Sequence, residues 1–304
     1  MKEWIEAMRL RTLPVSVAGV TAGTGCAVYH HGFSLIPMLI CLAFAIIAQI
    51  ASNFANEYYD FKNGLDKKGR EGFRRGVTEG DISPSAMRNA TFGLLAADII
   101  LGCSLIYWGG WWLIPVGAAI AVFALAYSAG PYPLSHHGLG DLAVVIFFGL
   151  VPVIFTEYVQ TRVFHISSTT LCAALGVGLL AANVLIINNY RDRDDDAAVG
   201  KRTTVVIFGK KIMANVYLID GITGCVLFAM ASTYSPSWTA AGWIVIVGWH
   251  LLLWQRLKSL QGAMLNNILK FTSILLCIAS IYLLVILSVW QEGAYQPDIN
   301  PYPL

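Results

Sequence analysis

Two stretches of the chain carry side chains whose types and spacing suit the binding of a divalent cation. The first holds Gln49, Asn53, Asn56 and Asp60, followed by Asp66. Side chains at intervals of three and four residues fall on one stripe of an α-helix. Because the neighbouring residues are mostly apolar, a polar stripe that ends in two carboxylates is costly unless it binds something. We interpret these residues as one half of a ligand site.

The second stretch lies in the other half of the chain and has the same character. Asn188, Asp192 and Asp196 are spaced four residues apart, and Lys201 and Arg202 follow them. A helix would present the first three side chains on one face. Each stretch also has an ordinary interpretation, since an acidic run can be a solvated loop and an asparagine can join two helices. The presence of both patterns favours a shared site.

Clusters of carboxylate and amide oxygens are the ligands that Mg²⁺ prefers, often together with the phosphates of a substrate. Two such clusters facing each other could hold a diphosphate between bridging ions. Lys201, Arg202, Arg74 and Arg75 are candidate contacts for the remaining phosphate oxygens. Arg74 and Arg75 could equally anchor the chain at a membrane surface. Metal and basic groups would stabilise the negative charge that develops as a diphosphate leaves.

The elements that position these residues are expected to be membrane-spanning helices. Of the 304 residues, 57% are hydrophobic and only 12% are charged, which is too few charges to cover a soluble globule. A bilayer-crossing segment must pair its backbone groups internally, so it forms a helix. We predict one all-α domain over residues 1–304 with nine transmembrane helices, near residues 12–29, 34–59, 84–108, 111–128, 141–160, 168–190, 211–232, 238–256 and 268–290.

The distribution of charge supports this topology. With nine spans, 19 of the 20 lysines and arginines fall on one face, and only Arg162 falls on the other. Such residues concentrate on the cytoplasmic side of membrane proteins. We therefore expect the N-terminus and both acidic stretches to be cytoplasmic, and the C-terminus to lie on the opposite face. The six cysteines all fall in apolar segments, where we interpret them as small buried residues.

At the two acidic stretches the chain resembles the UbiA superfamily of intramembrane prenyltransferases, and most of all its menaquinone branch. The first motif of that branch, N-D-x-x-D-x-x-x-x-x-D, corresponds here to Asn56, Asp60 and Asp66, with Glu57 in place of the usual aspartate. The second motif, D-x-x-x-D followed by G-K, corresponds to Asp192, Asp196, Gly200 and Lys201. Residues 9–14, residues 52–56, and residues 127–132 leading to 138–141 are also similar to this branch, and the resemblance extends over nearly the whole chain.

The resemblance implies nine helices around a central chamber and a specific reaction. A polyprenyl group would pass from a polyprenyl diphosphate to 1,4-dihydroxy-2-naphthoate, which loses CO₂ to give demethylmenaquinol or, after oxidation, demethylmenaquinone. This is a step of menaquinone biosynthesis. Mg²⁺, expected as two ions, would be held by Asn56, Asp60, Asp66, Asn188, Asp192 and Asp196.

The resemblance also implies roles for single residues. Asp60 and Asp192 are the expected catalytic carboxylates, and Asp141 is a candidate for orienting or deprotonating the acceptor. The alternative for Asp141 is a helix N-cap. Asn53, Tyr127 and Tyr132 are expected to contact the acceptor or the prenyl chain, although tyrosines are also common at membrane interfaces.

Two other functions remain open at the level of the sequence. The acceptor could be another aromatic compound, such as 4-hydroxybenzoate or homogentisate. The chain could instead be an ion-binding transporter or channel, which would need polar residues in both halves of the membrane, whereas here they gather toward the cytoplasmic half. The expected location is the inner cell membrane, in contact with the lipid bilayer and with no nucleic-acid partner. Asp98 and Asp220 lie within predicted spans and belong to neither motif.

Overall fold

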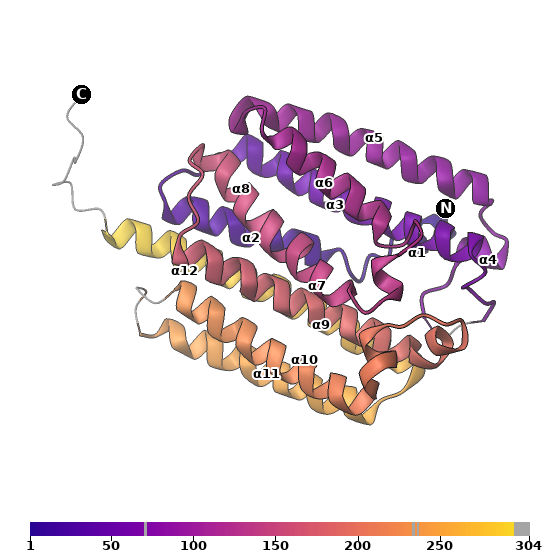
Figure 1. Ribbon diagram of the computed structural model, residues 1–304. Coiled ribbons are helices and arrows are strands. Elements are labelled where there is room, and N and C mark those ends of the chain that lie inside the picture. Colours follow the sequence, from indigo (N-terminus) through magenta and orange to yellow (C-terminus); the bar gives the residue numbers. More distant parts are fainter. Residues whose placement is uncertain (70–71, 233–234, 236, 295–304) are drawn as a thin grey trace.

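The computed structural model describes residues 1–69, 72–232, 235 and 237–294. Within these residues the chain is α-helical without any β-strand, which confirms the all-α prediction. The long helices run side by side as one bundle (Figure 1). They are α2 (Pro14–Tyr29), α3 (Leu35–Lys62), α5 (Pro84–Gly109), α6 (Leu113–Ala126), α9 (Ser168–Ala198), α10 (Thr204–Ala231), α11 (Thr239–Ser259) and α12 (Leu265–Ala294).

A further long segment is built from three consecutive pieces. These are α7 (Gly140–Val144), the π-helical turn η2 (Val145–Leu150) and α8 (Val151–Thr161). The remaining elements are short: α1 (Lys2–Ala7), α4 (Gly76–Glu79), η1 (Leu134–His136) and η3 (Gly262–Met264).

Each of the nine predicted spans overlaps one long helical segment, but the number of membrane crossings stays a prediction. Among the described residues, six segments are long and apolar enough to cross a bilayer, namely α3, α5, the α7–α8 segment, α9, α10 and the segment Gly262–Val289. The helices α2 and α6 have 16 and 14 residues, which is short for a crossing. The helix α11 has 21 residues, but three tryptophans, His250 and Gln255 lower its mean hydropathy. The chain is therefore a multi-pass membrane protein.

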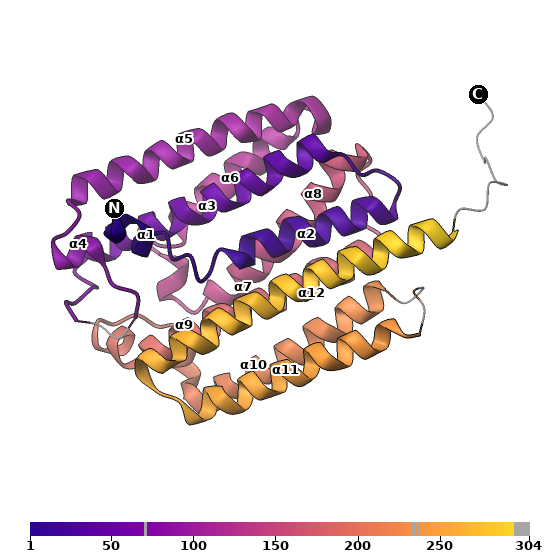
Figure 2. The ribbon, with the colours of Figure 1, turned by 180° about the vertical axis from the view of Figure 1, so that it is seen from behind.

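The helix α9 lies in the middle of the bundle and has the largest buried share among the candidate spans. It packs against α2, η2, α10 and α12 (Figures 1 and 2). Small residues allow this close approach, as is common between membrane helices. A Cβ atom added to Gly149 of η2 would lie 2.5 Å from the carbonyl oxygen of Ala174 and 2.6 Å from the Cα of Gly178.

The cytoplasmic ends predicted from charge gather at one end of the bundle. The short helices α1 and α4 lie there together with the last turns of α9 and the first turn of α10 (Figure 1). Within α10, Gly209 has a φ of 82°, so the helix bends there, two residues before the start of the predicted span 211–232. The predicted position of the C-terminus depends on residues 295–304, which lie outside the described residues. Arg70, one of the residues expected on the basic face, also lies outside them.

Candidate active site

A polar pocket of about 1000 Å³, its open mouth included, lies where α3 and α9 end. Both acidic motifs contribute to it, so the prediction that they face a common site agrees with the geometry. The candidate residues that line the pocket are Asn53, Asn56, Asp60, Arg75, Tyr127, Asn188, Asp192, Asp196 and Lys201.

Asp60 is fully buried and is the carboxylate that joins the two motifs. Lys201 donates a hydrogen bond of 2.7 Å to its Oδ2 atom. An Arg75 nitrogen lies 3.5 Å from the same oxygen, and His136 Nε2 lies 3.4 Å from Oδ1. A buried carboxylate is costly unless a positive group compensates it. The basic residues around Asp60 therefore compensate its negative charge. A bound metal ion could compensate the same charge.

Arg75 contacts all three residues of the first motif. Besides Asp60, its Nε atom lies 3.4 Å from Asp66 Oδ2, and it donates a 3.0 Å hydrogen bond to the side-chain oxygen of Asn56. The same oxygen accepts a 2.7 Å hydrogen bond from Arg9, and the Asn56 amide group donates to the hydroxyl of Ser128. Asp66 does not line the pocket itself, but Arg75 links it to the pocket wall.

The second motif is organised by Arg191. Its guanidinium group donates two hydrogen bonds, of 2.6 and 2.8 Å, to the two carboxylate oxygens of Asp192. It also donates to the side-chain oxygens of Asn188 and Asn266. Paired hydrogen bonds of this kind hold a carboxylate in a defined orientation. Asp192 therefore points toward the pocket in a position that its neighbouring residue has set.

The chain reverses directly after the second motif, and this turn positions Lys201. Gly200 has a φ of 79°, a left-handed conformation that favours glycine after a helix. The amide of Lys201 then donates a 2.9 Å hydrogen bond to the carbonyl of Asp196. The G-K pair of the motif thus has a local structural reason: glycine permits the turn, and the turn directs the lysine toward Asp60.

Several predicted site residues lie outside the pocket. Arg74 is half-exposed and pairs with Asp81 at 2.6 Å, whereas Arg202 is exposed. Tyr132 is exposed and stacks on the ring of His137. Asp141 is in the first turn of α7, where Leu139 is the N-cap residue, so it does not cap the helix. Their predicted roles remain proposals.

Two other residues of the first stretch form hydrogen bonds with the backbone of neighbouring segments. Asn53 lines the pocket wall but donates its amide hydrogen bond to the backbone carbonyl of Met8. Glu57, which replaces the usual aspartate, is fully buried and accepts a 3.0 Å hydrogen bond from the amide of Val77. The longer side chain therefore reaches the first turn of α4, and it does not line the pocket.

Several residues that border the pocket belong to neither acidic motif and had no predicted role in it. Arg9 lines it and has a φ of 54°, which is unusual for a residue other than glycine. Phe73 also lines it, and the guanidinium carbons of Arg9, Arg11 and Arg191 lie 5.5, 6.0 and 5.2 Å from its ring centre. His136 touches Asp60. Arg9 belongs to the stretch 9–14 that resembled the menaquinone branch, so that similarity was the available signal.

The donor set of the pocket fits Mg²⁺ on chemical grounds. Asn56 and Asp60 from α3 and Asn188, Asp192 and Asp196 from α9 supply amide and carboxylate oxygens to one space. Among the described residues, no group of three His, Cys, Asp or Glu side chains lies close enough to hold a metal ion. Mg²⁺ commonly uses only one or two protein carboxylates and takes its other ligands from phosphates and water. A diphosphate would complete such a site.

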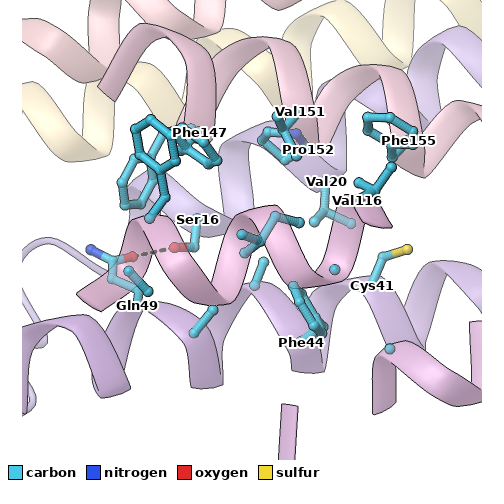
Figure 3. Close-up of a pocket in the computed structure, with 18 of the residues that line it drawn as sticks. Ser16, Val20, Cys41, Phe44, Gln49, Val116, Phe147, Val151, Pro152 and Phe155 are labelled. Carbon is cyan, nitrogen blue, oxygen red and sulfur yellow. Dashed lines mark hydrogen bonds between the residues drawn. The ribbon is translucent and has the colours of Figure 1, made fainter. Parts of the chain in front are cut away.

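An apolar pocket of about 1200 Å³ adjoins the polar one. Five residues line both pockets and define their boundary: Gln49, Ser52, Tyr127, Val144 and Phe148. At this end, Ser16 donates a hydrogen bond to Gln49, and farther along the wall lie Phe44, Cys41 and Phe155 (Figure 3). The arrangement can accommodate an elongated molecule with a charged head and an apolar tail.

Comparison with known proteins agrees with this geometry. A model of the UbiA prenyltransferase family matches residues 16–275. A 1,4-dihydroxy-2-naphthoate octaprenyltransferase of Haemophilus influenzae is 35% identical over 79% of this chain and 80% of its own length. The corresponding protein of Escherichia coli is 31% identical over 90% of this chain and 95% of its own.

A solved structure supports the same fold. A UbiA homolog from Archaeoglobus fulgidus, bound to GPP and Mg²⁺, has a TM-score of 0.65 at 14% sequence identity, and the match covers 93% of this chain and 100% of that one. At this identity the likeness concerns the fold alone. The matches to the family model and to these relatives show that the chain belongs to the UbiA prenyltransferase family.

Proposed function

We propose that the protein transfers a polyprenyl group from a polyprenyl diphosphate to 1,4-dihydroxy-2-naphthoate, with loss of CO₂, and so forms demethylmenaquinol. The main support is the junction of two pockets, one lined by both acidic motifs and the other apolar. The acceptor is inferred from the names of relatives that are 31–35% identical over most of the chain.

In this proposal the diphosphate lies in the polar pocket. Lys201 and Arg75 bind its oxygens, and both residues pair with Asp60 in the present structure. Asn56, Asp60, Asp66, Asn188, Asp192 and Asp196 are the proposed ligands of the divalent cation, which supplies Lewis-acid stabilisation of the departing diphosphate when bound. Arg191 keeps Asp192 oriented, because it holds both carboxylate oxygens.

The prenyl chain lies in the apolar pocket, whose walls exclude water from the reacting carbon. As the bond from that carbon to the diphosphate oxygen breaks, its electron pair leaves with the diphosphate. A ring carbon of the acceptor then forms the new bond, and the carboxylate leaves as CO₂. An apolar chamber suits this reaction because water would otherwise trap the cationic prenyl carbon.

The acceptor must reach the boundary between the pockets. Tyr127 lines both pockets. Among the residues proposed from the sequence to contact the acceptor, it is therefore the one whose position suits this role best. Asp141 follows Gly140 on α7, and a Cβ atom added to Gly140 would be 3.5 Å from the Tyr127 hydroxyl. The charge distribution supports a cytoplasmic site in the inner membrane, with the N-terminus on the same side.

The test uses the purified chain in lipid nanodiscs with Mg²⁺ and a mixture of polyprenyl diphosphates. Each candidate acceptor is added separately: 1,4-dihydroxy-2-naphthoate, 4-hydroxybenzoate and homogentisate. Mass spectrometry should detect a prenylated and decarboxylated naphthalenediol with the first acceptor. A product with only one of the other acceptors would refute the proposed acceptor, and no product with any of them would refute the aromatic transfer reaction itself.

A further inference from the structure

The boundary between the two pockets contains an aromatic residue that neither motif explains. Of the five residues that line both pockets, two are aromatic, Tyr127 and Phe148. If the diphosphate occupies the polar pocket and the prenyl chain the apolar one, the carbon–oxygen bond between them lies at this boundary. On this placement, Phe148 is one of the residues beside the carbon at which substitution takes place.

Phe148 is carried by an unusual piece of helix. The turn Val145–Leu150 is π-helical, and it interrupts the segment that continues as α8. Turns of this kind are rare and are frequently found at functional sites. Pro152 follows two residues after the turn and has no backbone N–H, so it cannot donate the usual helical hydrogen bond to the carbonyl of Phe148.

The surrounding helices hold this turn in place. A Cβ atom on Gly149 would collide with the backbone of α9 at Ala174 and Gly178, and one on Gly19 of α2 would lie 2.8 Å from the Pro152 ring. Close backbone packing on two sides leaves little room for the turn to shift. The position of Phe148 is thus preorganised, as catalysis requires of a group that stabilises charge.

The neighbouring phenylalanine has a different environment. Phe147 lines only the apolar pocket, and its ring stacks on that of Phe123 with a centroid distance of 3.9 Å. Among the described residues, no aromatic ring pairs with Phe148. Its ring thus has no aromatic neighbour competing for its face at the boundary, and aromatic faces attract positive charge.

We propose that Phe148 is a catalytic residue that stabilises the cationic prenyl carbon through its ring and shields that carbon from water. This inference rests on the proposed function and adds the group that governs the fate of the cation. As the carbon–oxygen bond breaks, the electron pair leaves with the diphosphate, and the carbon is captured by the acceptor ring with release of CO₂. If water captures it instead, the products are a prenol, free diphosphate and a proton.

The first experiment compares wild type with Phe148→Leu, Phe148→Tyr and Phe92→Leu in nanodiscs, using the donor and acceptor that wild type converts. Phe148→Leu should lower kcat roughly tenfold and change KM for the donor little, because the lost interaction acts on the cation. The ratio of prenol to prenylated product should rise several-fold. Phe148→Tyr should restore the wild-type ratio. Phe92→Leu is the matched control, since Phe92 lies on α5, is exposed and lines neither pocket, and it should leave the ratio unchanged.

The second experiment replaces Phe148 with mono-, di- and trifluorophenylalanine, which retain its shape. Fluorination withdraws charge from the ring face, so kcat should fall stepwise by roughly tenfold across the series. A flat series, or a Phe148→Leu variant with the wild-type prenol ratio, would overturn the proposal. Loss of folding in Phe148→Leu would leave the fluorinated series as the deciding test. Failure of wild type to use the naphthoate concerns the proposed function alone, and the Phe148 comparison is then made with the acceptor that is converted.

Discussion

Lys201 Nζ lies 2.7 Å from Asp60 Oδ2, so a residue of the second motif neutralises a carboxylate of the first across 141 positions of sequence. Asp192 has an equivalent partner in Arg191. The charged groups that would hold a metal–diphosphate complex are thus paired with one another in the protein alone. Binding of such a complex would exchange these ion pairs for contacts to metal and phosphate, which limits the cost of burying the carboxylates beforehand.

Removal of either central carboxylate should nearly abolish turnover. We expect Asp60→Ala and Asp192→Ala each to lower kcat/KM by at least about 100-fold, because the charge that develops on the diphosphate loses its stabilisation. Initial rates of product formation measure this effect. Asp194→Ala is the matched control, since Asp194 lies on α9 like Asp192 but its side chain is 79% exposed. Wild-type rates from either of the first two variants would remove that residue from the proposed site.

Lys201 and Arg202 are adjacent but should behave differently. Lys201→Met removes a buried positive charge from the pocket and should raise KM for the polyprenyl diphosphate about tenfold or more. Arg202→Met alters an exposed residue outside the pocket, so it should change KM less than about fivefold. Donor titrations at saturating acceptor give both values. Equal effects of the two substitutions would contradict the placement of the diphosphate beside Asp60.

Turnover should depend strictly on a divalent cation. Dialysis against EDTA should abolish prenyl transfer, and added Mg²⁺ should restore it, because the pocket supplies carboxylate and amide oxygens but relies on the metal for Lewis-acid chemistry. Binding of the diphosphate, followed by isothermal titration, should weaken in parallel. Prenyl transfer that persists in excess EDTA would refute the assignment of Asn56, Asp60, Asp66, Asn188, Asp192 and Asp196 as metal ligands.

The contact between η2 and α9 should be sensitive to a single methyl group. Gly149→Ala would place a Cβ atom 2.5 Å from the Ala174 carbonyl, so we expect a loss of about 1–3 kcal/mol in stability. Thermal unfolding in detergent measures the change as a lower Tm. Gly248→Ala is the control, because a Cβ added there would meet no atom within 4 Å apart from its own stretch of helix. An unchanged Tm for Gly149→Ala would show that the helices separate easily, which would weaken the argument for a fixed Phe148.

Much of the fold follows from local features of the sequence. Long apolar segments in a membrane can satisfy their backbone groups only as helices, so composition and the positions of the charged residues were enough to predict an all-α membrane protein. The intervals between Asn56 and Asp60 and among Asn188, Asp192 and Asp196 also reveal shared helix faces, since periodicity is a local property. These residues line one pocket.

Tertiary structure decided which of the candidate side chains meet. Arg75 and Arg74 are neighbours in sequence, yet Arg75 reaches Asn56, Asp60 and Asp66 whereas Arg74 pairs with Asp81. Nothing in their residue types distinguishes them, because the direction of each side chain depends on how the loop before α4 packs. The π-helical turn was not predicted from the sequence either, and at this point Gly149 packs against α9 and Pro152 against α2, which are distant in sequence. The sequence by itself determined where helices form, because backbone pairing and residue spacing are local. Only the packing of all the helices decided which side chains contact one another.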